Sequence, residues 1–167
     1  FEDTTMTTPL RFGLIGTGRI GQVHAASIAA DADAVLARVA DPFIDGARAV
    51  AETYGAIATA DAEELFTAGD LDAVLIASPT PTHVDLIARA IDAGIAALCE
   101  KPIDLDIARV DALRPRVAAS GVPVALGFNR RFDPAFAADR VSAVRRADRL
   151  HGVPNWLCFC LWCPFGG

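Results

Sequence analysis

The sequence predicts an α/β fold built on a doubly wound parallel sheet, and three observations support this prediction. Short apolar runs alternate along the chain with stretches of helical periodicity. The first apolar run leads through the turn Gly16-x-Gly18-x-x-Gly21 directly into a helical stretch. A later apolar run, at 71–77, is typical of a strand that helices cover on both faces. Strands separated by helices favour a parallel sheet with right-handed crossovers.

The order of the elements follows from this periodicity. We expect strands at 10–15, 35–40, 57–59, 71–77, 95–99 and 122–128. We expect helices at 19–30, 44–54, 61–66, 83–93, 104–119 and 133–149. The second helix should stop before Gly55 and the fourth before Gly94, because glycine commonly ends a helix. Asp61 can cap the third helix, and Pro115 should interrupt the fifth.

The glycine-rich turn has the spacing of a dinucleotide-binding turn. Gly16 would make the tight turn, Gly18 would let the backbone approach a pyrophosphate, and Gly21 would let the helix pack closely. The backbone N–H groups of Arg19 and Ile20 would then face the phosphates at the helix N-terminus. Glycine turns before helices are common, so the turn alone does not decide the function.

Asp41 ends the second predicted strand, some twenty residues beyond the glycine turn. A carboxylate at this position can accept both ribose hydroxyls of the adenosine half of a dinucleotide. It would also repel a 2'-phosphate, which favours NAD over NADP, although Arg48 could partly compensate. The alternative is that Asp41-Pro42 simply forms a turn, since both residue types favour strand ends.

The loop after the fourth predicted strand, SPTPTH, can reach the reactive half of a cofactor. Hydroxyl groups of this loop could contact the nicotinamide ribose while its prolines stiffen the backbone. The cofactor-binding candidates in it are Ser78, Thr80, Pro81 and His83. The alternative is helix capping by Thr80 or Thr82, with Pro81 near the first helical position. A lone histidine is more often structural, and this holds for His83 and for His24.

Lys101 is the sole lysine of the chain and follows the fifth predicted strand in the tripeptide Glu100-Lys101-Pro102. A lysine at the carboxyl edge of a parallel sheet, beside a carboxylate, can orient a substrate hydroxyl and take part in its proton transfer. Glu100 and Lys101 are therefore candidates for the cofactor site, and Lys101 for catalysis and substrate binding. The alternative for Lys101 is a surface salt bridge.

Together these motifs resemble those of the Gfo/Idh/MocA oxidoreductases, with the inositol 2-dehydrogenases as the nearest members. The resemblance rests on five segments in the expected order and spacing. They are Gly16 to Gly21, Ala40-Asp41-Pro42, Ser78 to His83, Glu100-Lys101-Pro102 and Gly127 to Pro134.

The resemblance implies an NAD-binding Rossmann domain over 6–131 and the start of an α/β substrate domain at 132–149. It implies oxidation of a secondary alcohol of a polyol or sugar, with hydride passing to NAD, in a homo-oligomeric protein. Lys101 would bind substrate within its proton network. Asn129 and Arg130 would lie near the cofactor and substrate cleft, although a polar linker between domains explains them equally well.

Two features depart from the family pattern. The family's catalytic Asp, followed four residues later by His, has no counterpart here, because the three histidines follow no aspartate at that spacing. The segment 150–167 is rich in cysteine and tryptophan, which suggests a non-native or frameshifted tail on a truncated chain. We therefore expect little or no activity. The alternative is a regulatory module that binds a dinucleotide without catalysis.

Composition limits the partners and the setting. With 53% hydrophobic residues in 167, the chain can bury one core and begin a second domain. The net charge of −6 argues against a nucleic-acid surface. No apolar run approaches the roughly 20 residues that span a bilayer, and no leader is evident around Met6, so we expect a cytoplasmic protein without membrane contacts. A structural zinc site normally needs four ligands, and the tail offers three cysteines, Cys158, Cys160 and Cys163, with His151 as a possible fourth. We favour a non-native apolar tail and expect no metal.

Overall fold

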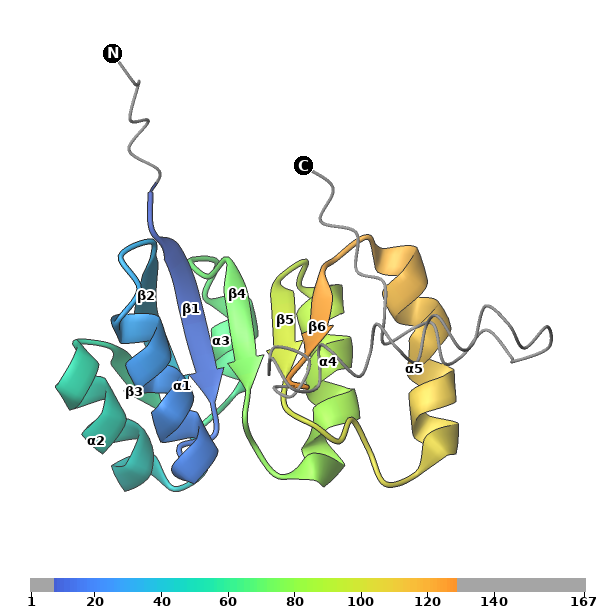
Figure 1. Cartoon of the computed structure of the whole chain (residues 1–167), viewed down its shortest axis with the longest axis horizontal. Helices are drawn as coiled ribbons and strands as arrows, with labels where there is room; N and C mark the ends of the chain where they lie inside the picture. Colours follow the sequence, from blue (N-terminus) through green and yellow to red (C-terminus); the bar gives the residue numbers. More distant parts are fainter. Residues whose placement is uncertain (1–7, 129–167) are drawn as a thin grey trace, which may run out of the picture. The chain divides into compact units, whose positions relative to one another are not determined.

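The computed structural model describes residues 8–128, which form a Rossmann-type α/β fold (Figure 1). The strands are β1 (Leu10–Ile15), β2 (Ala34–Ala40), β3 (Ile57–Thr59), β4 (Ala73–Ile76), β5 (Ala96–Cys99) and β6 (Val124–Leu126). The α-helices are α1 (Arg19–Ala29), α2 (Ile44–Tyr54), α3 (Glu63–Thr67), α4 (His83–Asp92) and α5 (Ile107–Ser120), and the 3-10 turn η1 (Thr80–Thr82) precedes α4. The predictions for 132–149 and 150–167, and for Asn129 and Arg130, lie outside the described residues.

All six strands are parallel, in the order β3-β2-β1-β4-β5-β6. The strand β1 therefore lies between β2 and β4, and the chain changes direction across the sheet at the β1/β4 boundary. In open parallel sheets, ligands bind outside the carboxyl ends of the strands at such a switch point. The loops after β1, β2, β4 and β5 all begin at this edge.

Alternate residues of the central strands point into two separate apolar layers. Leu14 and Leu75 pack with the helices α1 and α2 on one face of the sheet. Ile15 and Ile76 pack with α3, α4 and α5 on the other face. Burial of each such side chain contributes about 1.5–3 kcal/mol, so the buried apolar ends of β1 and β4 fix the centre of the fold.

Several predicted boundaries are wrong by two or more residues, including both ends of β6, which spans Val124–Leu126 rather than 122–128. The errors at β4 and α5 have local physical reasons. β4 starts at Ala73 rather than residue 71, because the Asp72 carboxylate turns back to accept the Arg11 N–H at 2.7 Å. α5 starts at Ile107 rather than residue 104, because Asp106 caps it through the Ala108 N–H. Pro115 does not interrupt α5. It lies on the exposed side of the helix, where water can bond the carbonyl group that the proline leaves unpaired.

The predicted end of α2 is confirmed. Gly55 ends α2 with a φ of 73°, in the left-handed region that glycine adopts without strain. The predicted cap of α3 is displaced by one residue, because Ala62 is the N-cap, although the Asp61 carboxylate still accepts the N–H of Glu63 at 2.9 Å. None of the helices within residues 8–128 combines the length and apolar character that crossing a bilayer requires. In the same residues, no group of three or more His, Cys, Asp or Glu side chains could hold a metal ion.

Candidate functional site

The glycine turn after β1 is tightly enclosed by the protein at two of its three glycines. Gly16 has a φ of 97°, and a Cβ atom there would lie 2.7 Å from the carbonyl group of Ala77. A Cβ atom at Gly21 would collide with the carbonyl oxygen of Gly16. The fold itself therefore requires glycine at both positions, because the backbone at Gly16 lies against that of Ala77 on one side and Gly21 of α1 on the other.

Gly18 differs, because a Cβ atom there would meet no heavy atom within 4 Å. Its backbone is extended, with φ −62° and ψ −177°, and it forms the N-cap of α1. No side chain bonds the free N–H groups at this helix N-terminus, and no acidic residue lies in the first turn. Open space beside free N–H groups and a positive helix dipole is the environment that a phosphate group needs. The turn therefore fits a dinucleotide.

Asp41, at the end of β2, is bonded directly to the glycine turn. Its Oδ2 atom accepts the backbone N–H of Thr17 at 2.8 Å and the Thr17 hydroxyl at 2.7 Å. Its Oδ1 atom accepts the N–H of Phe43 at 2.9 Å. Burial opposes ionisation, but these three hydrogen bonds outweigh it and hold the pKa of Asp41 below its ordinary value. The site thus carries a fixed negative charge beside the turn. Arg48 forms an exposed ion pair with Asp45.

The loop after β4 is held by bonds among its own residues. The hydroxyl groups of Ser78 and Thr82 lie 2.6 Å apart, and the Thr82 hydroxyl donates to the carbonyl oxygen of Pro79 at 2.8 Å. Thr82 is the N-cap residue of α4 and Pro81 lies in the first turn of η1, as the capping alternative expects, but neither Thr80 nor Thr82 caps a helix through its side chain. The Thr82 hydroxyl instead satisfies a carbonyl group at the entrance of η1.

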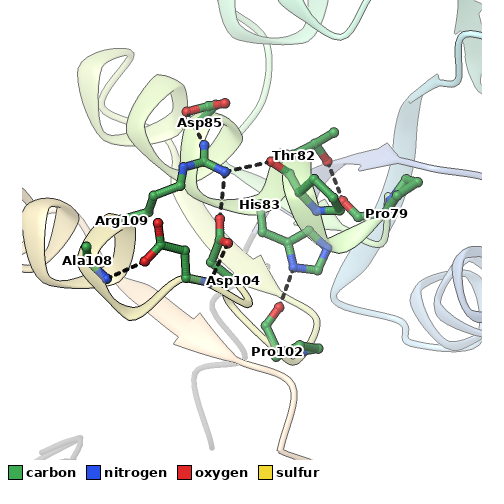
Figure 2. Close-up of polar contacts among 10 residues, drawn as sticks. Pro79, Thr82, His83, Asp85, Pro102, Asp104, Ala108 and Arg109 are labelled. Carbon is green, nitrogen blue, oxygen red and sulfur yellow. Dashed lines mark hydrogen bonds and ion pairs between the residues drawn. The ribbon is translucent and has the colours of Figure 1, made fainter.

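His83 joins this loop to the lysine loop (Figure 2). Its Nδ1 atom lies 2.8 Å from the carbonyl oxygen of Pro102, and its Nε2 atom lies 2.8 Å from that of Ser78. The side chain is only 1% exposed. Both ring nitrogens are engaged within the protein, which favours the structural alternative over direct cofactor contact.

Arg109 of α5 makes a second tie between the same two loops (Figure 2). Its guanidinium donates to Asp104 at 2.7 Å, to Asp85 at 2.9 Å and to the carbonyl oxygen of Pro81 at 3.2 Å. A hydrogen bond from the backbone N–H of Asp106, together with the charge of Arg109, lowers the pKa of Asp104. The loops after β4 and β5 are therefore one connected unit.

Lys101 is exposed between two anchored neighbours. The carbonyl oxygen of Pro102 is bonded to His83, and the Lys101–Pro102 peptide bond is cis. The backbone N–H of Lys101 donates to the Glu100 carboxylate at 3.2 Å. No ion pair joins Lys101 to another residue of 8–128. A salt bridge within this part of the chain therefore does not explain its position.

Glu100 is contacted by a helix from the other half of the sheet. Its Oε1 atom lies 2.8 Å from Nε2 of His24 in α1, and both side chains are largely buried. A Cβ atom at Gly127 would lie 3.1 Å from the same carboxyl group. Sequence reasoning gave no role to Thr17 or Arg109, discounted His24 and named Gly127 only as the start of a family-like segment. Thr17, between two glycines of the turn, also had a position in the sequence that could have drawn attention to it.

The predicted residues therefore gather at one edge of the sheet. The glycine turn and Asp41 are joined by direct hydrogen bonds, and His83 joins Ser78 to the lysine loop. Arg19 and Ile20 lie exposed at the start of α1. Asn129 and Arg130 lie beyond the part of the chain that the structure describes, so their contact with substrate stays a prediction.

Comparison with known proteins gives consistent matches. The family model for Gfo/Idh/MocA, described as an oxidoreductase family with an NAD-binding Rossmann fold, matches residues 10–128. An inositol 2-dehydrogenase of Rhizobium meliloti (strain 1021) is 52% identical over 132 residues, which are 78% of this chain and 39% of that protein. The chain thus spans about two fifths of the length of the curated relative.

Two solved structures agree with this match. A myo-inositol dehydrogenase from Corynebacterium glutamicum ATCC 13032 is 53% identical, with a TM-score of 0.75, over 83% of this chain and 42% of that one. A scyllo-inositol dehydrogenase from Lactobacillus casei, with bound NAD(H) and scyllo-inositol, is 28% identical, with a TM-score of 0.76, over the same shares. The resemblance and the Rossmann fold that the sequence predicts are both confirmed. The chain belongs to the Gfo/Idh/MocA family of oxidoreductases.

Proposed function

We propose that this chain binds NAD and forms the cofactor-binding part of a dehydrogenase that oxidises a secondary alcohol of a polyol or sugar, an inositol by preference. The observation that carries the proposal is the hydrogen bond from the Thr17 N–H to Asp41. This hydrogen bond holds the carboxylate proposed to bind the ribose against Thr17, the residue before Gly18, where the space for a phosphate is open. The bound NAD(H) of the Lactobacillus casei neighbour supports this assignment.

The charge of Asp41 supports NAD over NADP. Its lowered pKa keeps the carboxylate ionised at neutral pH. A 2'-phosphate group would bring further negative charge against it in a partly buried position, where water screens poorly. A carboxylate offers about four acceptor positions, and three are in use here. Binding of both ribose hydroxyls therefore requires the Thr17 hydroxyl to turn away.

Lys101 has the position for the substrate side of this chemistry. Bound NAD would accept the hydride from the alcohol carbon. We assign to Lys101 the binding of the substrate hydroxyl and a part in the transfer of its proton. The loops that carry Lys101 are held by His83 and Arg109, so little reorganisation is needed when substrate arrives. Asn129 and Arg130 stay predicted substrate contacts, and the cytoplasmic location and homo-oligomeric state stay predictions.

The first prediction concerns turnover by the full chain. We expect NAD+ to bind, while mixing the chain with NAD+ and myo-inositol yields NADH no faster than the Lys101→Ala variant does. The reason is that the Asp and His pair implied by the resemblance does not occur in this sequence. Calorimetry measures binding, and NADH absorbance measures turnover. Sustained, Lys101-dependent NADH formation would refute the expected inactivity, whereas failure to bind NAD+ would refute the cofactor assignment.

The family match does not favour the alternative of a non-catalytic regulatory module.

A further inference from the structure

Within residues 8–128, one side-chain hydrogen bond connects the lysine loop to the glycine-turn helix across the switch point of the sheet. His24 lies in α1, which begins at the glycine turn, and Glu100 directly follows β5. The Nε2 atom of His24 and the Oε1 atom of Glu100 are 2.8 Å apart. The side chains are 23% and 20% exposed, so water competes weakly for the contact. An ionised carboxylate only accepts hydrogen bonds, so His24 Nε2 carries the hydrogen.

The other contacts of Glu100 leave its carboxyl group little freedom. The backbone N–H of Glu100 donates to the carbonyl oxygen of Ile76 at 2.9 Å, which extends the pairing of β5 with β4. The second carboxylate oxygen accepts the N–H of Lys101 at 3.2 Å. On the remaining side lies Gly127, where any side chain would press against the carboxyl group. The Glu100 side chain is therefore held between α1, the β6 end and the backbone of Lys101.

We propose that His24 and Glu100 form a positioning pair for Lys101. His24 holds the Glu100 carboxylate, which in turn holds the backbone of Lys101 from its N-terminal side. His83 holds the carbonyl oxygen of Pro102 on the C-terminal side. The pair ties the orientation of the lysine to the helix whose N-terminus faces the cofactor. The function of the pair rests on the proposed role of Lys101, but its structural effect does not.

The test uses the full chain and two readouts that need no turnover. Hydrogen exchange reports how firmly the segment 100–106 is held. Reductive methylation with ¹³C-formaldehyde labels the N-terminal amine and the side chains of lysines. Lys101 is the sole lysine, so the labelled chain gives one side-chain NMR signal. We expect His24→Ala and Glu100→Gln each to raise exchange in 100–106 by about fivefold or more and to shift the Lys101 signal. Exchange in α2 should stay unchanged.

Three further variants make the result specific. His24→Gln keeps a side-chain N–H donor and should restore slow exchange and the original signal. The variant that carries both His24→Ala and Glu100→Gln should add little to either single change, because both changes weaken the same chain of contacts from His24 through Glu100 to the Lys101 backbone. Arg116→Gln breaks the Arg116–Asp92 pair between α5 and α4, at 2.9 Å, and should alter neither readout.

The proposal fails if His24→Ala leaves exchange and the Lys101 signal as in the unaltered chain. It also fails if exchange rises by the same factor throughout residues 8–128, or if His24→Gln behaves like His24→Ala. A chain that does not bind NAD+ would refute the proposed function instead, because the exchange of 100–106 in the free chain still decides whether the pair holds the loop.

Discussion

At the scale of single residues, the glycines of the turn after β1 are required for different reasons. Gly16 and Gly21 are enclosed by the backbone around Ala77 and by each other. Gly18 is enclosed by nothing in the described chain. The sequence motif assigns the three glycines different roles, and the structure agrees that the fold encloses Gly16 and Gly21 while the space beside Gly18 is open.

This difference gives the second prediction. Gly21→Ala should destabilise the chain by about 3 kcal/mol or more, because its methyl group collides with the Gly16 carbonyl oxygen. Gly18→Ala should cost no more than about 1 kcal/mol, as a change at a helix N-cap. It should nevertheless weaken NAD+ binding about tenfold or more, by filling the space where a pyrophosphate approaches. Thermal unfolding and calorimetry measure the two effects. Equal loss of stability in both variants would contradict this explanation.

Single residues also show what the sequence could not reveal. The motif spacing located Asp41 and Lys101, but the partners that hold them come from distant segments. His24 is separated from Glu100 by 76 residues, and Arg109 from Pro81 by 28. Such contacts depend on how far each helix rotates over the sheet, which local periodicity does not determine. Discounting His24 as a lone histidine was therefore reasonable from the sequence and incomplete in the structure.

At the scale of elements, hydrophobic periodicity predicted which helices and strands exist better than it predicted where each one begins and ends. The ranges of β1, α2 and β3 agree with prediction to the residue. Errors occurred where a side chain captured a backbone group, as at Asp72 and Asp106, or where exposure made Pro115 tolerable inside α5. These outcomes depend on tertiary contacts and solvent exposure, which a sequence window does not contain.

Asp70, in the loop before β4, forms ion pairs with β1 and β2, and the stability that these pairs contribute should depend on pH. Its carboxylate accepts from Arg38 of β2 and from Arg11 of β1. The bond from Arg38 is the largest cause of its lowered pKa. A lowered folded-state pKa adds stability that is complete above the unfolded value of about 3.9 and is lost as the pH falls through the folded value.

The third prediction follows from that sign. Asp70→Asn should lower the melting temperature near pH 7 by ~2–4 °C and should make it fall less steeply on acidification below about pH 4. The variant Asp45→Asn, which breaks the exposed pair with Arg48, is the matched control and should change neither quantity. Melting curves across this pH range provide the measurement. Parallel curves for Asp70→Asn and the unaltered chain would rule out the contribution of Asp70.

At the scale of the whole molecule, the order of strands follows from the sequence pattern because few topologies satisfy it. Right-handed crossovers between parallel strands, with a change of direction after β3, lead to the order found. That order places the carboxyl ends of β1, β2, β4 and β5 along one edge. The chemistry-bearing loops meet there because of topology, although they are far apart in sequence.

The positions of the candidate cofactor residues were thus largely predictable, and those of the candidate substrate residues were not. Gly18, Asp41 and Lys101 lie in the connections that follow β1, β2 and β5, whose positions the fold fixes. The residues that would choose among polyols and sugars were predicted at Asn129 and Arg130 from resemblance alone. No strand or helix periodicity indicates which hydroxyl group a loop will bind, so the substrate assignment rests on the relatives.

The most direct test of the central claim is calorimetric titration of the full chain with NAD+ and, separately, with NADP+. We predict one NAD+ site per chain, with NAD+ binding at least about tenfold more tightly than NADP+, a difference of about 1.4 kcal/mol. Asp41→Asn should weaken NAD+ binding and narrow the difference between the two, since the charge that rejects the 2'-phosphate is removed. Absence of NAD+ binding, or equal affinity for both dinucleotides in the unaltered chain, would contradict the account.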